Sequence, residues 1–213
     1  MNIHCARGLR GLVGTLVVGL VLGIGPGCDN DDGHDDSGFD FGLNDANLVI
    51  CIGDSITENG YPAYLGGMIS KIAVDHGVGG VPSAAAIGAA QAALAAHPGY
   101  LLILYGANDI IQGRPLEAIP ENLRAVINMA RANKTIPCLA TLTPMIGIQI
   151  GHAAQVQVVN DMIRQLAETE DVRMADLFSE FGDQPEQYML SDGLHPNAAG
   201  HQAVAASFAD ACF

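Results

Sequence analysis

The sequence predicts a three-layer α/β/α sandwich around a central, mostly parallel sheet of about five strands. Almost continuous apolar runs, such as Asn47–Ile52 and Tyr100–Tyr105, alternate with longer segments of helical character. Strands that are apolar throughout are typical of parallel sheets covered by helices on both faces. The chain of 213 residues is long enough for one domain with a proper core. It contains no internal repeat, and no part of it is left over for a second domain.

Each element has its own local signal. The run 83–96 is almost pure alanine, and its small side chains allow close packing against a sheet. The segment 115–132 has a proline that is acceptable in the first turn of a helix and apolar residues that repeat along one face. We expect strands at 47–52, 71–74, 100–105, 135–141 and 172–175, all of them buried, and helices at 61–69, 83–96, 115–132, 156–168 and 198–211.

The first predicted strand ends at Gly53-Asp54-Ser55. Glycine permits a sharp turn, so Ser55 should lie just past the carboxyl end of a central parallel strand. Open α/β sheets bind ligands at that edge. The alternative is that Ser55 only caps the following helix, a position that serine favours.

A carboxylate and an imidazole occur together near the other end of the chain, at Asp192 and His195. A serine hydroxyl becomes a good nucleophile when a base takes its proton, and a carboxylate fixes the tautomer of that base. The order Ser, Asp, His along the chain matches hydrolases with this triad. The Gly-x-Ser-x-Gly elbow is absent, because Ile56 and Thr57 follow Ser55.

Four short blocks in this order resemble the SGNH (GDSL-type) hydrolase family. They are Gly53-Asp54-Ser55, Gly77-Val78-Gly79-Gly80, Gly106-Ala107-Asn108-Asp109 and Asp192-Gly193-Leu194-His195. The resemblance covers nearly all of the chain after its first segment, and it implies a flavodoxin-like strand order.

The resemblance also implies a role for individual residues. Ser55 would be the nucleophile, His195 its base and Asp192 the partner that orients the base. Gly80 and Asn108 would donate hydrogen bonds to the oxyanion together with the N–H of Ser55. Gly79 is the alternative glycine donor, because Asp75-His76 stands where the family commonly has an asparagine. Asp109, by contrast, is assigned to structure.

The implied activity is hydrolysis of carboxylic esters by a lipase, lysophospholipase or thioesterase-like enzyme through an acyl-enzyme, without a metal or organic cofactor. One alternative is a polysaccharide O-acetyl esterase, although a chain with no Trp and 5% aromatic residues offers little surface for stacking on sugars. Another is a surface lipoprotein that binds without catalysis, which the complete triad disfavours. The net charge of −14 argues against a nucleic acid or anionic lipid partner.

The apolar segment 144–152 is bracketed by proline and glycine. We expect Met145, Ile146 and Ile148 to be exposed, and Ile146 and Ile148 to form a rim that binds the acyl chain. The alternative is ordinary burial of a long crossover connection.

The N-terminus has the pattern of a bacterial export signal. Arg7 and Arg10 precede an uncharged apolar stretch that meets Cys28, as in a signal peptide over residues 1–27. The residues before Cys28 resemble a lipobox, which implies a lipid anchor on Cys28. The expected protein is an exported lipoprotein on the periplasmic or extracellular side of the membrane. Ordinary secretion and a retained anchor are the alternatives.

An acidic tether is predicted over residues 28–45, because dense like charges without apolar periodicity favour disorder. The hydrolase domain would then span residues 46–213. Within it, Cys51, Cys138 and Cys212 are expected to be buried free thiols, since an odd number of cysteines with no evident pairing disfavours a disulfide framework.

Overall fold

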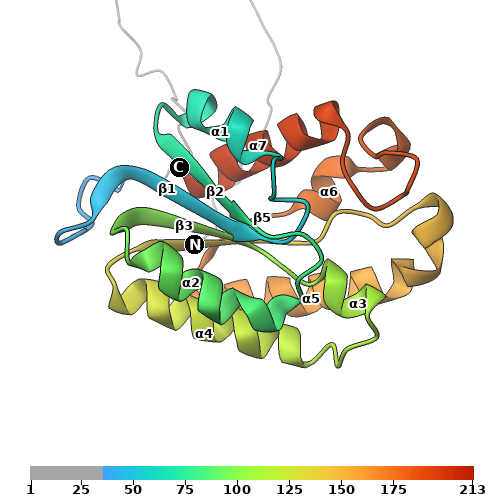
Figure 1. Ribbon diagram of the computed structural model, residues 1–213, viewed down its shortest axis with the longest axis horizontal. Helices are drawn as coiled ribbons and strands as arrows, with labels where there is room; N and C mark the ends of the chain where they lie inside the picture. Colours follow the sequence, from blue (N-terminus) through green and yellow to red (C-terminus); the bar gives the residue numbers. More distant parts are fainter. Residues whose placement is uncertain (1–35) are drawn as a thin grey trace, which may run out of the picture. The chain divides into compact units, whose positions relative to one another are not determined.

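A computed structural model describes residues 36–213, which form a five-stranded sheet with helices on both faces (Figure 1). All neighbouring strands are parallel, and their order is β2-β1-β3-β4-β5. This is the flavodoxin-like order, so the predicted fold is confirmed. The strands are β1 (Asp45–Gly53), β2 (Ile72–Gly77), β3 (Pro98–Leu104), β4 (Ile136–Ala140) and β5 (Arg173–Ala175).

The helices form two layers. One layer holds α1, α6 and α7, and the other holds α2, α4 and α5, with α3 near the carboxyl edge of the sheet (Figure 1). The helices are α1 (Pro62–Ile69), α2 (Ala86–Leu94), α3 (Ala107–Ile111), α4 (Ala118–Ala132), α5 (Ala153–Glu170), α6 (Leu177–Phe181) and α7 (Ala198–Cys212), and the 3₁₀ helices are η1 (Ser83–Ala85), η2 (Gly147–His152) and η3 (Pro185–Gln187). No helix within residues 36–213 has the length and apolar character needed to cross a membrane.

The core lies on both sides of the three central strands. Every residue of β3 and of β4 is buried, as are the last five residues of β1. The prediction that all strands are buried is wrong for the two edge strands: β2 leaves Ile72 60% exposed, and two of the three residues of β5 are only half-buried. An edge strand tolerates polar residues, and β2 therefore continues through Asp75 and His76 instead of ending at Val74.

Residues 36–44 pack against the domain. Asp36 forms an ion pair with Arg173 of β5 and accepts a hydrogen bond from the hydroxyl of Tyr100 at 2.9 Å. Phe41 packs against the Tyr100 ring. This part of the predicted 28–45 tether is therefore ordered, because an ion pair and aromatic contacts hold it. The predicted signal peptide, Cys28 and the tether up to residue 35 lie outside the described residues.

Two of the three cysteines predicted to be free are joined. Cys138 of β4 and Cys212 at the end of α7 form a disulfide, with their Cα atoms 6.1 Å apart. Only Cys51 remains a buried free thiol among the described residues. The prediction was wrong for the pair because the return of α7 to the sheet brings together residues that are 74 positions apart.

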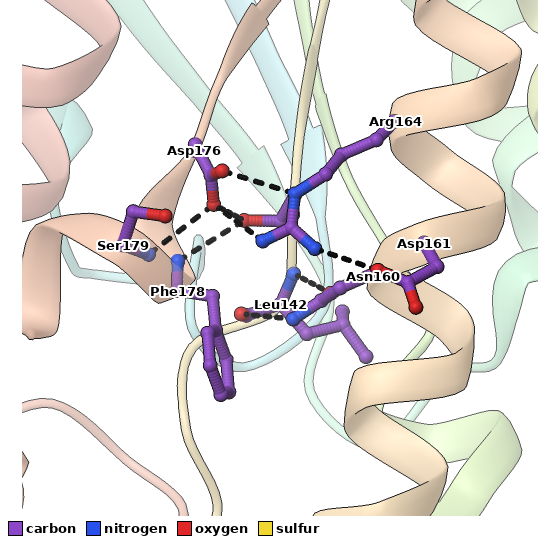
Figure 2. Close-up of polar contacts among 8 residues, drawn as sticks. Leu142, Asn160, Asp161, Arg164, Asp176, Phe178 and Ser179 are labelled. Atoms are coloured by element: carbon purple, nitrogen blue, oxygen red, sulfur yellow. Dashed lines mark hydrogen bonds and ion pairs between the residues drawn. The ribbon is translucent and has the colours of Figure 1, made fainter.

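The loop that follows β4 is held by polar side chains, some of them buried (Figure 2). The side chain of Asn160, which is fully buried on α5, accepts a hydrogen bond from the N–H of Leu142 at 2.7 Å and donates one to its carbonyl at 3.1 Å. Next to it, Asp176 binds Arg164 of α5 and accepts a hydrogen bond from the Thr141 hydroxyl. The loop thus leaves the sheet in a fixed direction, toward the edge where Ser55 lies.

Candidate active site

Ser55 lies two residues beyond the last residue of β1, as predicted. The chain turns sharply here, because the carbonyl of Asp54 accepts hydrogen bonds from the N–H groups of Thr57 and Glu58. A Cβ atom on Gly53 would lie 2.0 Å from the Thr57 hydroxyl oxygen and 2.8 Å from the Leu104 carbonyl oxygen. Only glycine therefore fits between the central strand and the turn that carries Ser55.

The structure brings Ser55, His195 and Asp192 into one hydrogen-bonded chain, although Ser55 and His195 are 140 positions apart. The Oγ atom of Ser55 is 2.8 Å from Nε2 of His195, and Nδ1 of His195 is 2.8 Å from Oδ2 of Asp192. The other oxygen of Asp192 accepts hydrogen bonds from the backbone N–H groups of Leu194 and His195. The three side chains thus have the arrangement that activates a serine hydroxyl.

The electrostatics of Asp192 suit this arrangement. Its partial burial acts to raise the pKa, but the backbone N–H groups of His195 and Leu194, together with the His195 imidazole, outweigh burial and lower the pKa to about 2. Asp192 is therefore a carboxylate at neutral pH and can only accept hydrogen bonds. Nδ1 of His195 must then carry the proton, which leaves the lone pair of Nε2 facing the Ser55 hydroxyl.

Two glycine-rich or polar turns lie beside Ser55. A Cβ atom built on Gly79 would lie 3.7 Å from Cβ of Ser55, so the loop after β2 runs against the serine. Gly80 has φ +75°, and its carbonyl accepts a hydrogen bond from Gln112 at 2.9 Å. Asn108 lies in the first turn of α3, directly after β3. The predicted blocks thus meet at the carboxyl edge of the sheet.

Asp54 is a buried residue of the site that the sequence analysis did not single out. It is 1% exposed, and one oxygen accepts a hydrogen bond from Asn108 Nδ2 at 3.1 Å. Asp54 belongs to the first family block, but the block alone assigns it no role. Its burial and its contact with Asn108 identify it as part of the site. The buried Asp109 accepts hydrogen bonds from the N–H and hydroxyl of Ser83 at 2.7 and 2.8 Å, consistent with its predicted structural role.

The segment predicted as an acyl-binding rim touches the loop of the triad. The N–H of Ile146 donates a hydrogen bond to the Gly193 carbonyl at 3.0 Å. Ile148 is 79% exposed, whereas Met145 is buried and Ile146 is half-buried against the core. The predicted exposure is therefore wrong for Met145 and holds only in part for Ile146, because these side chains pack toward the core instead of facing solvent. Within residues 36–213, no three His, Cys, Asp or Glu side chains are grouped to hold a metal ion.

A parallel α/β sheet with a Ser–His–Asp hydrogen-bond chain at its carboxyl edge defines a class of hydrolases. Residues 51–203 match the GDSL-like Lipase/Acylhydrolase family. The chain belongs to this family and is an ester hydrolase of the GDSL/SGNH type, which confirms the resemblance seen in the sequence.

Solved structures share this fold. A protein of the lipolytic G-D-S-L family from Desulfitobacterium hafniense DCB-2 is 25% identical, with a TM-score of 0.68 over 76% of this chain and 99% of the other. A G-D-S-L family member from Veillonella parvula DSM 2008 is 22% identical, with a TM-score of 0.67 over 76% of this chain and 95% of the other.

A variant of an acetyl-xylooligosaccharide esterase from Geobacillus Stearmophilus is 19% identical, with a TM-score of 0.68 over 80% of this chain and 96% of the other. At 22% and 19% identity, the likeness to the Veillonella and Geobacillus proteins establishes the fold alone. Comparison with curated proteins gives no significant match.

Proposed function

We propose that the protein is a serine-dependent carboxylic-ester hydrolase that works through an acyl-enzyme on Ser55. The observation that carries this proposal is the hydrogen-bond chain from Ser55 through His195 to Asp192, with 2.8 Å at both links. A chain of this kind at the exposed end of a central strand is suited to nucleophilic attack on a carbonyl.

In the proposed reaction, Oγ of Ser55 attacks the ester carbonyl while Nε2 of His195 takes its proton. The negative charge that develops on the carbonyl oxygen is stabilised by the N–H groups of Ser55 and Gly80 and by the amide of Asn108. Collapse of the tetrahedral intermediate breaks the ester bond, and His195 returns the proton to the leaving alcohol. Water, activated by the same imidazole, then attacks the acyl-enzyme and releases the acid.

We further propose that the acyl group of the substrate is apolar. The segments after the carboxyl ends of β2, β3 and β4, and the loop before Asp192, each carry exposed apolar side chains. The first three segments follow parallel strands and the fourth leads into Asp192, so all four lie toward the catalytic edge of the sheet. Burial of an acyl chain against them would be favourable. The exposed side chains are Val78, Ile111, Ile148, Ile150 and Leu190.

The rim is tested by Ile148→Ser. The expected result is about a tenfold loss in kcat/KM for octanoyl esters relative to acetyl esters, because each lost apolar contact discriminates modestly. Ile72→Ser is the matched control: Ile72 is 60% exposed but lies at the opposite, amino-terminal end of β2. An unchanged chain-length preference in Ile148→Ser would exclude this residue from the acyl site.

The reaction itself is tested by hydrolysis of p-nitrophenyl esters from acetyl to long acyl chains. The wild type should be active, and Ser55→Ala should lose activity by more than about 1,000-fold. Activity confined to acetyl esters would favour the alternative, a polysaccharide O-acetyl esterase. A folded Ser55→Ala protein that keeps its activity would rule out the proposed mechanism.

We also propose that the protein is exported, either as a lipoprotein anchored through Cys28 or in secreted form. The Cys138–Cys212 disulfide supports export, because disulfides persist in oxidising compartments. Metabolic labelling with a palmitate analogue tests the anchor: the full chain should be labelled, and Cys28→Ala should not. Equal labelling of both proteins would contradict lipidation at Cys28.

A further inference from the structure

Asp54 is a buried carboxyl group at the active site whose role the proposed triad does not explain. Its side chain makes two hydrogen bonds. Oδ1 accepts from the backbone N–H of Ile56 at 3.0 Å, and Oδ2 accepts from Nδ2 of Asn108 at 3.1 Å. With 1% of its surface exposed, Asp54 has little access to water, so these two groups are its principal partners.

The contact with Asn108 decides which end of the amide faces the substrate. An asparagine side chain has a donor end and an acceptor end of nearly the same shape, so packing alone distinguishes them poorly. An ionised carboxylate only accepts hydrogen bonds and therefore selects the NH₂ end. One hydrogen of Nδ2 is used by Asp54, and the second remains available to the oxygen of the reacting carbonyl.

Protonation of Asp54 removes this selection. A neutral carboxylic acid can donate its proton to the amide oxygen, and Asn108 can then rotate by a half turn. Its carbonyl oxygen would face the developing oxyanion, which it repels, and one of the three donors would be lost.

We propose that Asp54 is a positioning residue that, in its ionised form, orients Asn108 as an oxyanion donor, and that protonation of Asp54 disables this donor. The inference rests on the proposed function of Ser55, since it concerns the oxyanion formed by attack of that residue. It adds an ionisation on which the reaction depends, separate from the proton transfer to His195.

The surroundings of Asp54 place this ionisation in an accessible pH range. Burial raises its pKa to about 6, against the hydrogen bonds from Ile56 and Asn108 and the nearby His195, which lower it, while Asp109 raises it. Tyr105 also faces Asp54, and its own pKa is raised by burial and by that charge. Asp54 is thus charged at neutral pH and becomes protonated in mild acid.

A double-mutant cycle tests the positioning role. The kcat and KM for a p-nitrophenyl ester are measured in wild type, Asp54→Asn, Asn108→Ala and the double variant. Asp54→Asn should lower kcat by about 10- to 100-fold, less than complete loss of an oxyanion donor, with KM within about twofold. In the Asn108→Ala background the same change should cost less than about twofold. Equal losses in both backgrounds, or no loss in kcat, would overturn the proposal.

The pH profile provides a test that leaves Asp54 in place. Below pH ~6, log kcat/KM should fall more steeply with decreasing pH in the wild type than in Asn108→Ala, because Asp54 must be ionised only where an amide remains to be oriented. Asp161→Asn, a change of an exposed carboxylate on α5, should keep the wild-type slope. The same slope in wild type and Asn108→Ala would overturn the proposal.

The two proposals fail in different ways. An active Ser55→Ala protein would overturn the serine mechanism itself. An inactive Ser55→Ala protein, combined with an additive cycle for Asp54 and Asn108, would leave the serine mechanism standing and remove only the positioning role.

Discussion

Replacing Asn160 by alanine should strongly destabilise the domain, because one side chain holds two buried backbone groups. Its amide satisfies both the N–H and the carbonyl of Leu142, at 2.7 and 3.1 Å, and Asn160 has no exposed surface (Figure 2). A buried polar group left without a partner costs about 1–3 kcal/mol. Loss of both contacts should therefore lower the free energy of unfolding by about 4 kcal/mol.

The assay is urea unfolding followed by circular dichroism, together with ester hydrolysis under conditions where the variant is folded. The loop that begins near Leu142 reaches Ile146, which binds the backbone of Gly193 in the triad loop. We therefore expect kcat to fall in the folded variant as well. Asp161→Ala is the control: it is the next residue on α5, its side chain is 78% exposed, and the change should cost less than about 0.5 kcal/mol.

A loss below about 1 kcal/mol in Asn160→Ala, or a loss equal to that of Asp161→Ala, would refute the reasoning. It would mean that the backbone of Leu142 finds other partners and that the amide of Asn160 does not fix the loop.

Three further predictions follow from particular contacts. Replacing Cys138 and Cys212 together by alanine should cost about 4 kcal/mol in urea unfolding, from the entropy of a loop closed across 74 positions; unchanged stability would contradict this. Because the pKa of Asp54 is raised from 3.8 to about 6, the contribution of Asp54 to stability should fall by about 3 kcal/mol as pH rises through that interval. The stability difference between wild type and Asp54→Asn should therefore change by that amount over the interval, and parallel stability curves for the two proteins would contradict the prediction. Gly193→Ala should lower kcat about tenfold, since φ is +69° and a Cβ would lie 2.0 Å from a backbone carbonyl oxygen. Gly88→Ala, on an open helix surface, should instead stabilise the fold by about 0.5–1 kcal/mol, and equal kcat values for both glycine variants would contradict the role of Gly193.

The central strands and the triad could be predicted because their signals are local. β3 and β4 are apolar throughout, and each of Ser55, Asn108 and His195 lies within a short motif at the end of an element. Strand order required the family resemblance, because hydrophobic periodicity does not specify which strands are neighbours. The short helices α3 (Ala107–Ile111) and α6 (Leu177–Phe181) were missed because five residues are too few to show a helical period.

The remaining differences come from contacts between distant parts of the chain. Asp36 looks like one more charge in an acidic run, and contacts with distant residues order it, among them its ion pair with Arg173, 137 positions away, and its hydrogen bond from Tyr100. The disulfide was missed for the same reason, since a buried thiol and a buried disulfide occupy similar apolar sequence contexts. The role inferred for Asp54 depends on its burial and on its distance to Asn108. Both are properties of the folded chain that a sequence motif does not contain.

The central claim is that Ser55 is a nucleophile activated by His195. It is tested most directly by titrating the protein with diethyl p-nitrophenyl phosphate, which phosphorylates activated serines, and mapping the product by mass spectrometry. The account predicts release of about one p-nitrophenol per chain and a diethylphosphoryl group on Ser55, with a much slower reaction in His195→Ala. A phosphoryl group on another residue, or an unmodified Ser55 in a protein that still hydrolyses esters, would contradict it.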